Sequence, residues 1–254
     1  MLDAVIVAGG KNNSFLSTDY KEPYEALIKI NDIHMISFVA DALYKSQYIK
    51  KIIIAGPKTE LSKCILPPST IIVEGGETII ETTKRAVDIL NHNERFLVAA
   101  TDIPFLTVEA INDFIMQCST KTADLFYPII TKEVFESKFP GNKRTYATLK
   151  EGIFTGGNIF IMKPAVVNEC SAIAEQMISN RKSVFRLCSL LGWNFVIKFC
   201  LKILKIEEVE KRVSELLNAK GSAIISNYPE LGIDVDKPSD LDFARSILKN
   251  KNLL

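Results

Sequence analysis

The sequence predicts an α/β fold in which a mostly parallel β-sheet is covered by helices on both faces. Short apolar runs alternate with amphipathic helical patterns along the first half of the chain. The runs are apolar throughout, which is typical of parallel strands that are buried on both faces. Ligands bind beyond the carboxyl ends of the strands in such sheets, so we expect the chemistry in the segments that follow the strands.

The first half of the chain supplies most of the expected elements. Apolar runs predict strands at residues 4–8, 51–55, 70–73 and 95–100. Helical periodicity predicts helices at residues 35–44, 77–90 and 108–117. Thr107 directly precedes the last of these helices and can cap it.

The second half is less regular. Strands are predicted at residues 124–130 and 159–162, whereas residues 134–150 are polar and basic and predict a loop or lid. Residues 181–217 have a helical, amphipathic pattern and form a predicted insertion. A last helix is expected from Asp240.

The composition is that of a globular protein. The 254 residues are 47% hydrophobic and 24% charged, which is enough for one domain over residues 1–254 with a large core. A net charge of +1 argues against a nucleic-acid partner. Five cysteines without CxxC spacing and two histidines offer little for disulfides, zinc or histidine-based catalysis. The apolar run that directly follows the start predicts a core strand and no signal peptide, so we expect a cytoplasmic protein.

Residues 187–206 are strongly apolar, but Lys198, Lys202 and Lys205 interrupt them. Charges inside a membrane span are costly and no uninterrupted apolar run of about 20 residues exists, so we expect no transmembrane helix. An apolar helix is usually buried, so this segment is expected to pack on the core or to form a homodimer contact. A site for a hydrophobic acceptor and contact with a membrane surface are the alternatives.

Gly9 and Gly10 follow the first predicted strand directly. Glycine allows a close backbone approach to a ligand, and N–H groups in such a turn can cradle phosphates. An ordinary tight turn is the alternative explanation. Neither GxGxxG nor GxxxxGK[ST] occurs, which excludes the dinucleotide-binding and P-loop motifs.

Three aspartates are candidate metal ligands. Asp102 follows the predicted strand at residues 95–100, where a carboxylate points into the ligand crevice. Asp234 and Asp236 are two residues apart, so both can face one site if the segment is extended. Such oxygen donors, together with phosphate oxygens, suit Mg²⁺. A role in turns or helix caps is the alternative for all three.

The candidate acceptor-binding residues precede the strand at residues 159–162. Gly157 permits close approach, and the amide of Asn158 can donate to and accept from sugar-like hydroxyl groups. Lys143 and Arg144 offer cations for phosphate. A β-turn and a solvated basic surface are the alternatives.

Taken in order, these segments resemble the MobA-like nucleotidyltransferases. The matching stretches are VAGG (residues 7–10), EALIKI (25–30), TDIPFLT (101–107), TGGNIFI (155–161) and DVDKPSDL (234–241). The resemblance implies a three-layer, doubly wound, Rossmann-like fold with a mostly parallel mixed sheet, here with the helical insertion at residues 181–217. It also implies an NTP bound over the Gly-Gly turn and Mg²⁺ held by Asp102 and Asp236. Asp234 does not match the family aspartate and is a secondary candidate ligand.

The resemblance further implies that the chain moves NMP from an NTP to a phosphorylated acceptor and releases pyrophosphate. Molybdopterin, a sugar or polyol phosphate and a phospholipid precursor are the acceptors considered. The expected nucleotide-binding residues are Ala8, Gly9, Gly10, Lys11, Gly75, Gly76 and Thr78.

Two departures from the family pattern bear on catalysis. The arginine of the family's GxSxRxG loop is missing, and Glu25 stands where the family has a lysine. We therefore expect Lys21 or Lys29 to serve as the catalytic lysine, with Lys11 as a further candidate. A nucleotide-binding protein without turnover is an alternative function. A GT-A type glycosyltransferase with Asp234 and Asp236 as its DxD motif is another, although that motif lies unusually close to the C-terminus.

Overall fold

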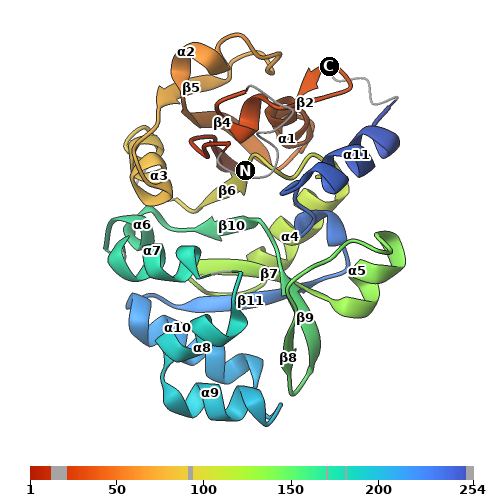
Figure 1. Ribbon diagram of the computed structural model, residues 1–254. Helices are drawn as coiled ribbons and strands as arrows, with labels where there is room; N and C mark the ends of the chain where they lie inside the picture. Colours follow the sequence, from red (N-terminus) through yellow and green to blue (C-terminus); the bar gives the residue numbers. More distant parts are fainter. Residues whose placement is uncertain (13–21, 91–93, 170, 181, 250–254) are drawn as a thin grey trace.

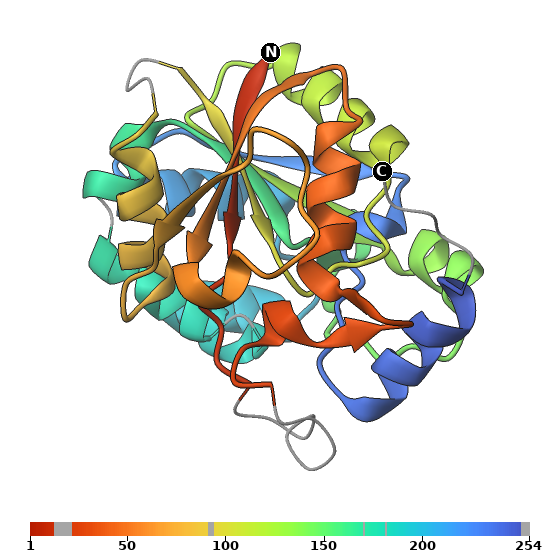
Figure 2. The same ribbon diagram turned by 90° about the horizontal axis from the view of Figure 1, so that it is seen from above.

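A computed structural model describes residues 1–12, 22–90, 94–169, 171–180 and 182–249. Its central feature is a nine-stranded mixed β-sheet with the strand order β5-β4-β1-β6-β10-β7-β9-β8, in which β11 also pairs with β7. The sheet runs through the whole molecule (Figure 1). Helices cover both of its faces, and Figure 2 shows the strands between α3 on one side and α1 on the other.

The N-terminal half of the sheet is parallel. β1 (Leu2–Val7) lies between β4 (Ile49–Gly56) and β6 (Phe96–Ala100), and β5 (Ile71–Glu74) pairs with the outer side of β4. These four strands are the ones that the continuous apolar runs predict. Their parallel arrangement brings all four carboxyl ends to one edge of the sheet.

The second half of the sheet is mixed. β10 (Ile159–Met162) runs antiparallel between β6 and β7 (Leu125–Thr131). β9 (Gly152–Gly156) continues along the same side of β7 and forms an antiparallel pair with β8 (Ala147–Leu149). β11 (Gly221–Ser226) lies parallel to β7 on its other side.

Alternate residues of the buried strands enter two different cores. Ile6 of β1 belongs to the large core, which also contains residues of α1 (Met35–Tyr44) and α4 (Val108–Ser119). Val5 belongs to the core on the opposite face, which contains residues of α3 (Ile79–Val87). This period of two, with apolar residues on both faces, confirms the predicted three-layer, doubly wound fold.

The remaining elements complete the two helical layers and connect the strands. α6 (Pro164–Glu169) and α7 (Ser171–Ser179) contact α3. The shorter connecting elements are η2 (Glu25–Leu27), β2 (Lys29–Ile30), β3 (Ile33–His34), α2 (Lys58–Leu61) and η3 (Pro229–Leu231).

The prediction of a loop at residues 134–150 is wrong at both of its ends. α5 (Lys132–Lys138) begins there because the Thr131 hydroxyl accepts the N–H of Val134 and caps the helix, and because Phe135 is fully buried. The other end of the segment forms β8, which pairs with β9. Only the stretch between these two elements is irregular.

The C-terminal helix, α11 (Pro238–Ile247), begins two residues earlier than predicted. Pro238 occupies its first position, where a missing N–H costs no hydrogen bond. The carboxylate of Asp240 accepts the N–H of Asp236 at 3.2 Å and so fixes the segment that leads into the helix.

The predicted insertion is helical and consists of α8 (Val184–Leu191), α9 (Trp193–Cys200) and α10 (Ile206–Leu217). α8 and α9 are separated by Gly192, whose φ of 119° suits glycine. Cys188, Val196 and Leu204 of this segment form a small buried cluster that is separate from the two cores of the sheet, and Leu149 of β8 packs against it. In the described part of the chain, no helix has both the length and the apolar character needed to cross a bilayer.

Candidate active site

The site lies at the edge of the sheet where the parallel strands end. Val7 of β1 is paired in register with Ala100 of β6. Gly9 and Gly10 follow the first of these strands and Asp102 follows the second, so the turn and the carboxylate leave the sheet at the same edge. Asp102 is 6% exposed, so its side chain is largely shielded from solvent.

The structure brings the three predicted metal ligands together. One carboxylate oxygen from each of Asp102, Asp234 and Asp236 lies within 4.8 Å of the other two. The main chain supports this arrangement, since the N–H of Val235 donates to the main-chain oxygen of Asp102 at 2.8 Å. The segment with the aspartate pair is therefore attached directly to the end of β6.

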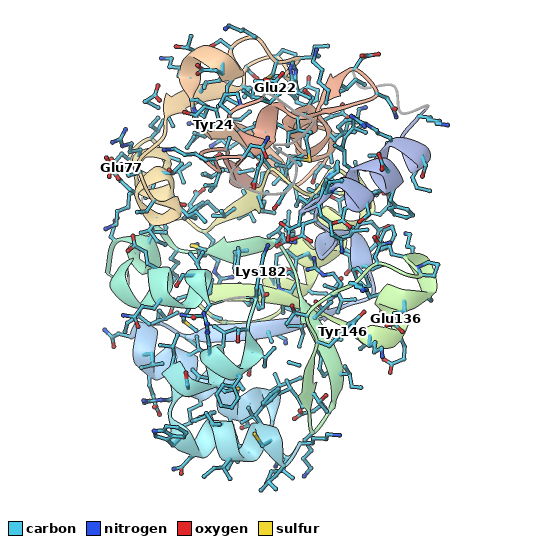
Figure 3. All side chains as sticks on the ribbon, viewed as in Figure 1. Glu22, Tyr24, Glu77, Glu136, Tyr146 and Lys182 are labelled. Atoms are coloured by element: carbon cyan, nitrogen blue, oxygen red, sulfur yellow. The ribbon has the colours of Figure 1, made fainter. Side chains whose placement is uncertain are left out.

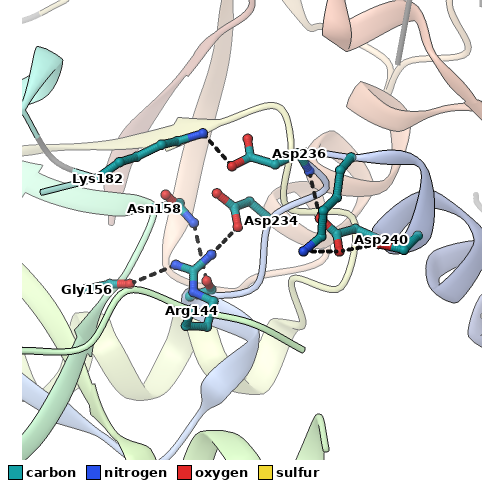
Figure 4. A network of polar contacts seen from close by, with 10 residues as sticks. Arg144, Gly156, Asn158, Lys182, Asp234, Asp236 and Asp240 are labelled. Atoms are coloured by element: carbon teal, nitrogen blue, oxygen red, sulfur yellow. Dashed lines mark hydrogen bonds and ion pairs between the residues drawn. The ribbon is translucent and has the colours of Figure 1, made fainter. Parts of the chain in front are cut away.

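Two cations face this carboxylate cluster (Figure 4). Arg144 forms an ion pair with Asp234, and its other terminal nitrogen donates to the main-chain oxygen of Gly156 at 3.3 Å. The ammonium group of Lys182 lies 2.5 Å from Oδ2 of Asp236. Lys182 was not among the predicted site residues. It lies between α7 and α8, more than 50 positions before its partner, and no local pattern connects the two.

Burial raises the pKa of Asp234, and the neighbouring carboxylate of Asp236 acts in the same direction. The Arg144 guanidinium opposes this rise in the pKa of Asp234. A cation beside a buried carboxylate offsets the cost of removing its charge from water. Arg144 therefore helps to keep Asp234 in the charged form that a metal ligand requires.

The candidate acceptor residues lie beside the carboxylate cluster. The main-chain N–H of Asn158 donates to Leu231 at 2.7 Å, and its side-chain amide donates to Gly232 at 3.5 Å. A Cβ atom at Gly157 would lie 2.7 Å from Cγ of Pro128, so the backbone leaves no room for a side chain there. The hydrogen bonds of Asn158 thus attach the turn between β9 and β10 to Leu231 and Gly232, which lie just before the aspartate pair. Lys143 is exposed on the loop that leads to Arg144.

Thr82 of α3 joins the two glycine segments, a role that the sequence pattern did not indicate. Its hydroxyl accepts the N–H of Gly76 at 3.0 Å, and a Cβ atom at Gly9 would lie 3.4 Å from the same oxygen. Gly75 donates to the main-chain oxygen of Gly56 at 2.9 Å. The predicted nucleotide-binding glycines are thus held side by side. The main-chain N–H of Ala8 donates to the main-chain oxygen of Ala55 at 2.7 Å, which holds Ala8 next to β4.

Thr78 has a structural role in addition to its predicted contact with nucleotide. Its hydroxyl accepts the N–H of Glu81 at 3.1 Å, which caps α3, and donates to Glu175 at 3.0 Å. Both interactions use the oxygen that a nucleotide would need.

The predicted catalytic lysines differ in position. Lys29 is exposed on β2, and its main-chain oxygen accepts a hydrogen bond from Arg245 at 3.4 Å. Lys11 forms an isolated antiparallel β-bridge with Tyr24, next to the Gly-Gly turn. Lys21 lies outside the described residues. Figure 3 shows Lys182 between Tyr24 on one side and Tyr146 on the other, over the middle of the face that is seen there.

Glu25 approaches the Gly-Gly turn directly. Its N–H donates to the main-chain oxygen of Gly10 at 3.1 Å, and a Cβ atom at Gly10 would lie 2.9 Å from its carboxylate. An acidic group therefore faces the turn at the position where the family pattern has a lysine.

A glycine turn, a carboxylate cluster and two cations lie together at the carboxyl edge of a doubly wound sheet, which is where such folds bind phosphate ligands and metal ions. The family model for the MobA-like NTP transferase domain matches residues 4–187. The chain belongs to this family.

Solved structures agree with this assignment. A hypothetical transferase from Thermus thermophilus is 33% identical over 94% of this chain and 99% of its own, with a TM-score of 0.78. CMP:2-keto-3-deoxy-manno-octonic acid synthetase, solved with CTP, is 11% identical over 98% of this chain and 99% of its own, with a TM-score of 0.63. The 2-C-methyl-D-erythritol 4-phosphate cytidylyltransferase of Francisella tularensis is 12% identical over 97% and 99%, with a TM-score of 0.58. The last two share the fold. No curated protein gives a significant sequence match.

Proposed function

We propose that this nucleotidyltransferase uses Mg²⁺ to transfer a nucleoside monophosphate from an NTP to a phosphorylated sugar or polyol. The observation that carries the proposal is the convergence of Asp102, Asp234 and Asp236 within 4.8 Å at the edge of the sheet where the Gly9-Gly10 turn emerges. The similarity in fold to a cytidylyltransferase that acts on methylerythritol 4-phosphate supports this class of acceptor. Molybdopterin and a phospholipid precursor are the acceptors to test beside it.

The donor set fits Mg²⁺. Carboxylate oxygens are the protein ligands that this ion prefers, and it normally completes its shell with substrate phosphates and water. When bound at Asp102, Asp236 and Asp234, the ion would supply charge that neutralises the triphosphate.

The residues of the chain bind and orient the two substrates. The N–H groups of the Gly9-Gly10 turn would cradle phosphate oxygens. Arg144 and Asn158 lie beside the carboxylate cluster (Figure 4) and would hold the acceptor. A phosphate oxygen of the acceptor attacks the α-phosphorus, the bond between the α-phosphorus and the bridging oxygen breaks, and pyrophosphate leaves with the electron pair. Catalysis then consists of positioning and charge stabilisation.

The remaining expectations are part of the same proposal. The chain acts in the cytoplasm as one nucleotidyltransferase domain over residues 1–254, with residues 181–217 as a helical insertion. Lys11, Lys21 and Lys29 are the lysines proposed to replace the one that Glu25 displaces. The homodimer contact that the sequence predicts through residues 187–206 is untested and is not part of this proposal.

Pyrophosphate release tests the proposal. The purified protein is incubated with Mg²⁺, each NTP in turn and a panel of phosphorylated acceptors. We expect release only when one particular NTP and one acceptor are both present. Asp102→Asn should lower kcat by about 10²- to 10³-fold, because it removes a ligand of the ion whose charge would stabilise the transferred group. The control is Asp242→Asn, since Asp242 is exposed on α11. Full activity of the Asp102→Asn variant would refute the assigned mechanism.

The position of Glu25 favours a second candidate function, which is nucleotide binding without turnover. Glu25 stands where the family pattern has a lysine, so the positive charge that would assist transfer is missing at this position. This function predicts NTP binding in calorimetry and no pyrophosphate with any acceptor. A single productive acceptor excludes it.

A further inference from the structure

The α9 helix is apolar on nearly all sides, and the rest of the chain covers only one of them. Of its eight residues, only Asn194 and Lys198 are polar. Val196 is buried in a cluster with Cys188 and Leu204. A helix that is apolar all round is normally buried or in contact with lipid. The uncovered side of α9 is therefore unusual for a surface helix.

The uncovered side carries a continuous row of large apolar side chains. Trp193, Ile197 and Leu201 are spaced by four residues and so lie on one face, which we call the α9 stripe. They are 77%, 55% and 62% exposed. Phe185 of α8 and Ile203 are also exposed large apolar residues of this insertion. Contiguous exposed apolar surface of this kind marks a contact with a partner or a membrane.

Basic residues outnumber acidic ones around the α9 stripe. Residues 184–205 contain four basic residues and no acidic one, namely Arg186, Lys198, Lys202 and Lys205. Glu208 and Glu215 of α10 line a hollow together with Trp193, and Glu215 is paired with Arg212. Glu208 forms an ion pair with Lys198, and Glu151 accepts the N–H of Ile206. An apolar row flanked by basic residues suits an anionic bilayer, because the apolar side chains can enter the interface while the basic side chains contact the anionic headgroups.

The position of α9 in the molecule permits contact with a flat surface. The helix forms the lower end of the molecule in Figure 1, beyond α8 and at the opposite end from α2 and β5. The candidate active site is nearer the middle, where the two halves of the sheet meet. The stripe can therefore touch a planar partner without covering the site.

We infer that the α9 stripe docks on the surface of an anionic lipid bilayer. Trp193, Ile197 and Leu201 enter the interface between headgroups and acyl chains, and the basic residues contact lipid phosphates. A second copy of the chain fits this surface less well. In a two-fold symmetric contact the same patch meets itself, so the basic residues of one copy would face those of the other. This inference does not depend on the proposed function.

Flotation with vesicles tests the inference. The full chain is mixed with vesicles of phosphatidylcholine that contain phosphatidylglycerol, and in parallel with vesicles of phosphatidylcholine alone. We expect the protein to float with the anionic vesicles, and the bound fraction to fall as salt is added. The combined variant W193A, I197A and L201A should lower the partition coefficient by more than about ten-fold, because it removes most of the buried apolar area. Arg186→Gln with Lys202→Gln should lower it about five-fold for each charge.

The matched control replaces three exposed apolar residues elsewhere with alanine, in the combined variant I65A, M116A and I247A. It should float like the unmodified chain. Circular dichroism and thermal unfolding verify that every variant is folded. The inference is overturned if the unmodified chain stays out of the anionic lipid fraction, or if the α9-stripe variant floats as well as the control. It is also overturned if the unmodified chain does not bind vesicles and forms a dimer that the α9-stripe variant cannot form.

Discussion

The main-chain N–H of Val235 donates to the main-chain oxygen of Asp102 at 2.8 Å, across more than 130 positions of sequence. This bond joins the segment that follows β6 to the segment that precedes α11. The side chains of Asp234 and Asp236 flank it and meet the Asp102 carboxylate. The carboxylate cluster is thus built on a backbone connection between two segments that the sequence alone leaves far apart.

Arg144→Met is expected to lower the free energy of unfolding by about 3 kcal/mol, because it leaves the buried Asp234 carboxylate without its cation. Urea unfolding at neutral pH without Mg²⁺ measures the change. Arg144→Lys is the matched control, since it keeps the charge and should recover part of the loss. Equal stability of the Met variant and the unmodified chain would show that the ion pair contributes nothing.

Lys182→Met is expected to strengthen Mg²⁺ binding. The Lys182 ammonium group lies 2.5 Å from Asp236 and competes with a metal ion for that carboxylate. An exposed ion pair contributes at most about 1 kcal/mol, so the gain in affinity should not exceed about five-fold. Calorimetric titration with Mg²⁺ measures it. Lys163→Met, which removes the cation beside Asp124, serves as a control that should leave the affinity unchanged. Weaker Mg²⁺ binding by the Lys182 variant would contradict the competition.

Thr78→Ala is expected to lower the free energy of unfolding by about 1 kcal/mol, because α3 loses the hydroxyl that accepts the N–H of Glu81. Thr78→Ser should preserve the cap and the stability. Thermal unfolding of both variants gives the comparison. The same variants separate the cap from the predicted nucleotide contact, since a pure cap leaves the KM for NTP unchanged whereas a nucleotide contact raises it in the Ala variant.

Asp124 provides a test by pH. The side-chain bond from Lys163 and the main-chain N–H of Lys220 hold the pKa of Asp124 below its ordinary value. A carboxyl group with a lowered pKa in the folded state stabilises the protein above its unfolded pKa, and this contribution is lost as the pH falls through the folded pKa. Asp124→Asn should therefore be less stable than the unmodified chain at neutral pH, and the difference should shrink with acidification. Unfolding in urea over a series of pH values follows it, and a constant difference would refute the assignment.

The positions of the buried strands were predictable because they depend on local composition. The helix at residues 35–44 and the strand at residues 159–162 have the predicted bounds, and Thr107 caps α4 as expected. The family pattern was recognisable for the same reason, since its motifs are short and follow the strands in order. β11 was not predicted, because the extended conformation of its six residues depends on their pairing with β7.

The sequence by itself determined the α/β layers, the parallel half of the sheet and the three carboxylates, because apolar periodicity and short motifs are local properties of the chain. Only the tertiary structure decided which cations face those carboxylates and which side of α9 stays uncovered. Arg144 and Lys182 reach their aspartates across 90 and 54 positions of sequence. Such ion pairs depend on the paths of the loops between the two residues. The burial of a helix face depends on what packs against it. Neither can therefore be predicted from the spacing of residues along the chain.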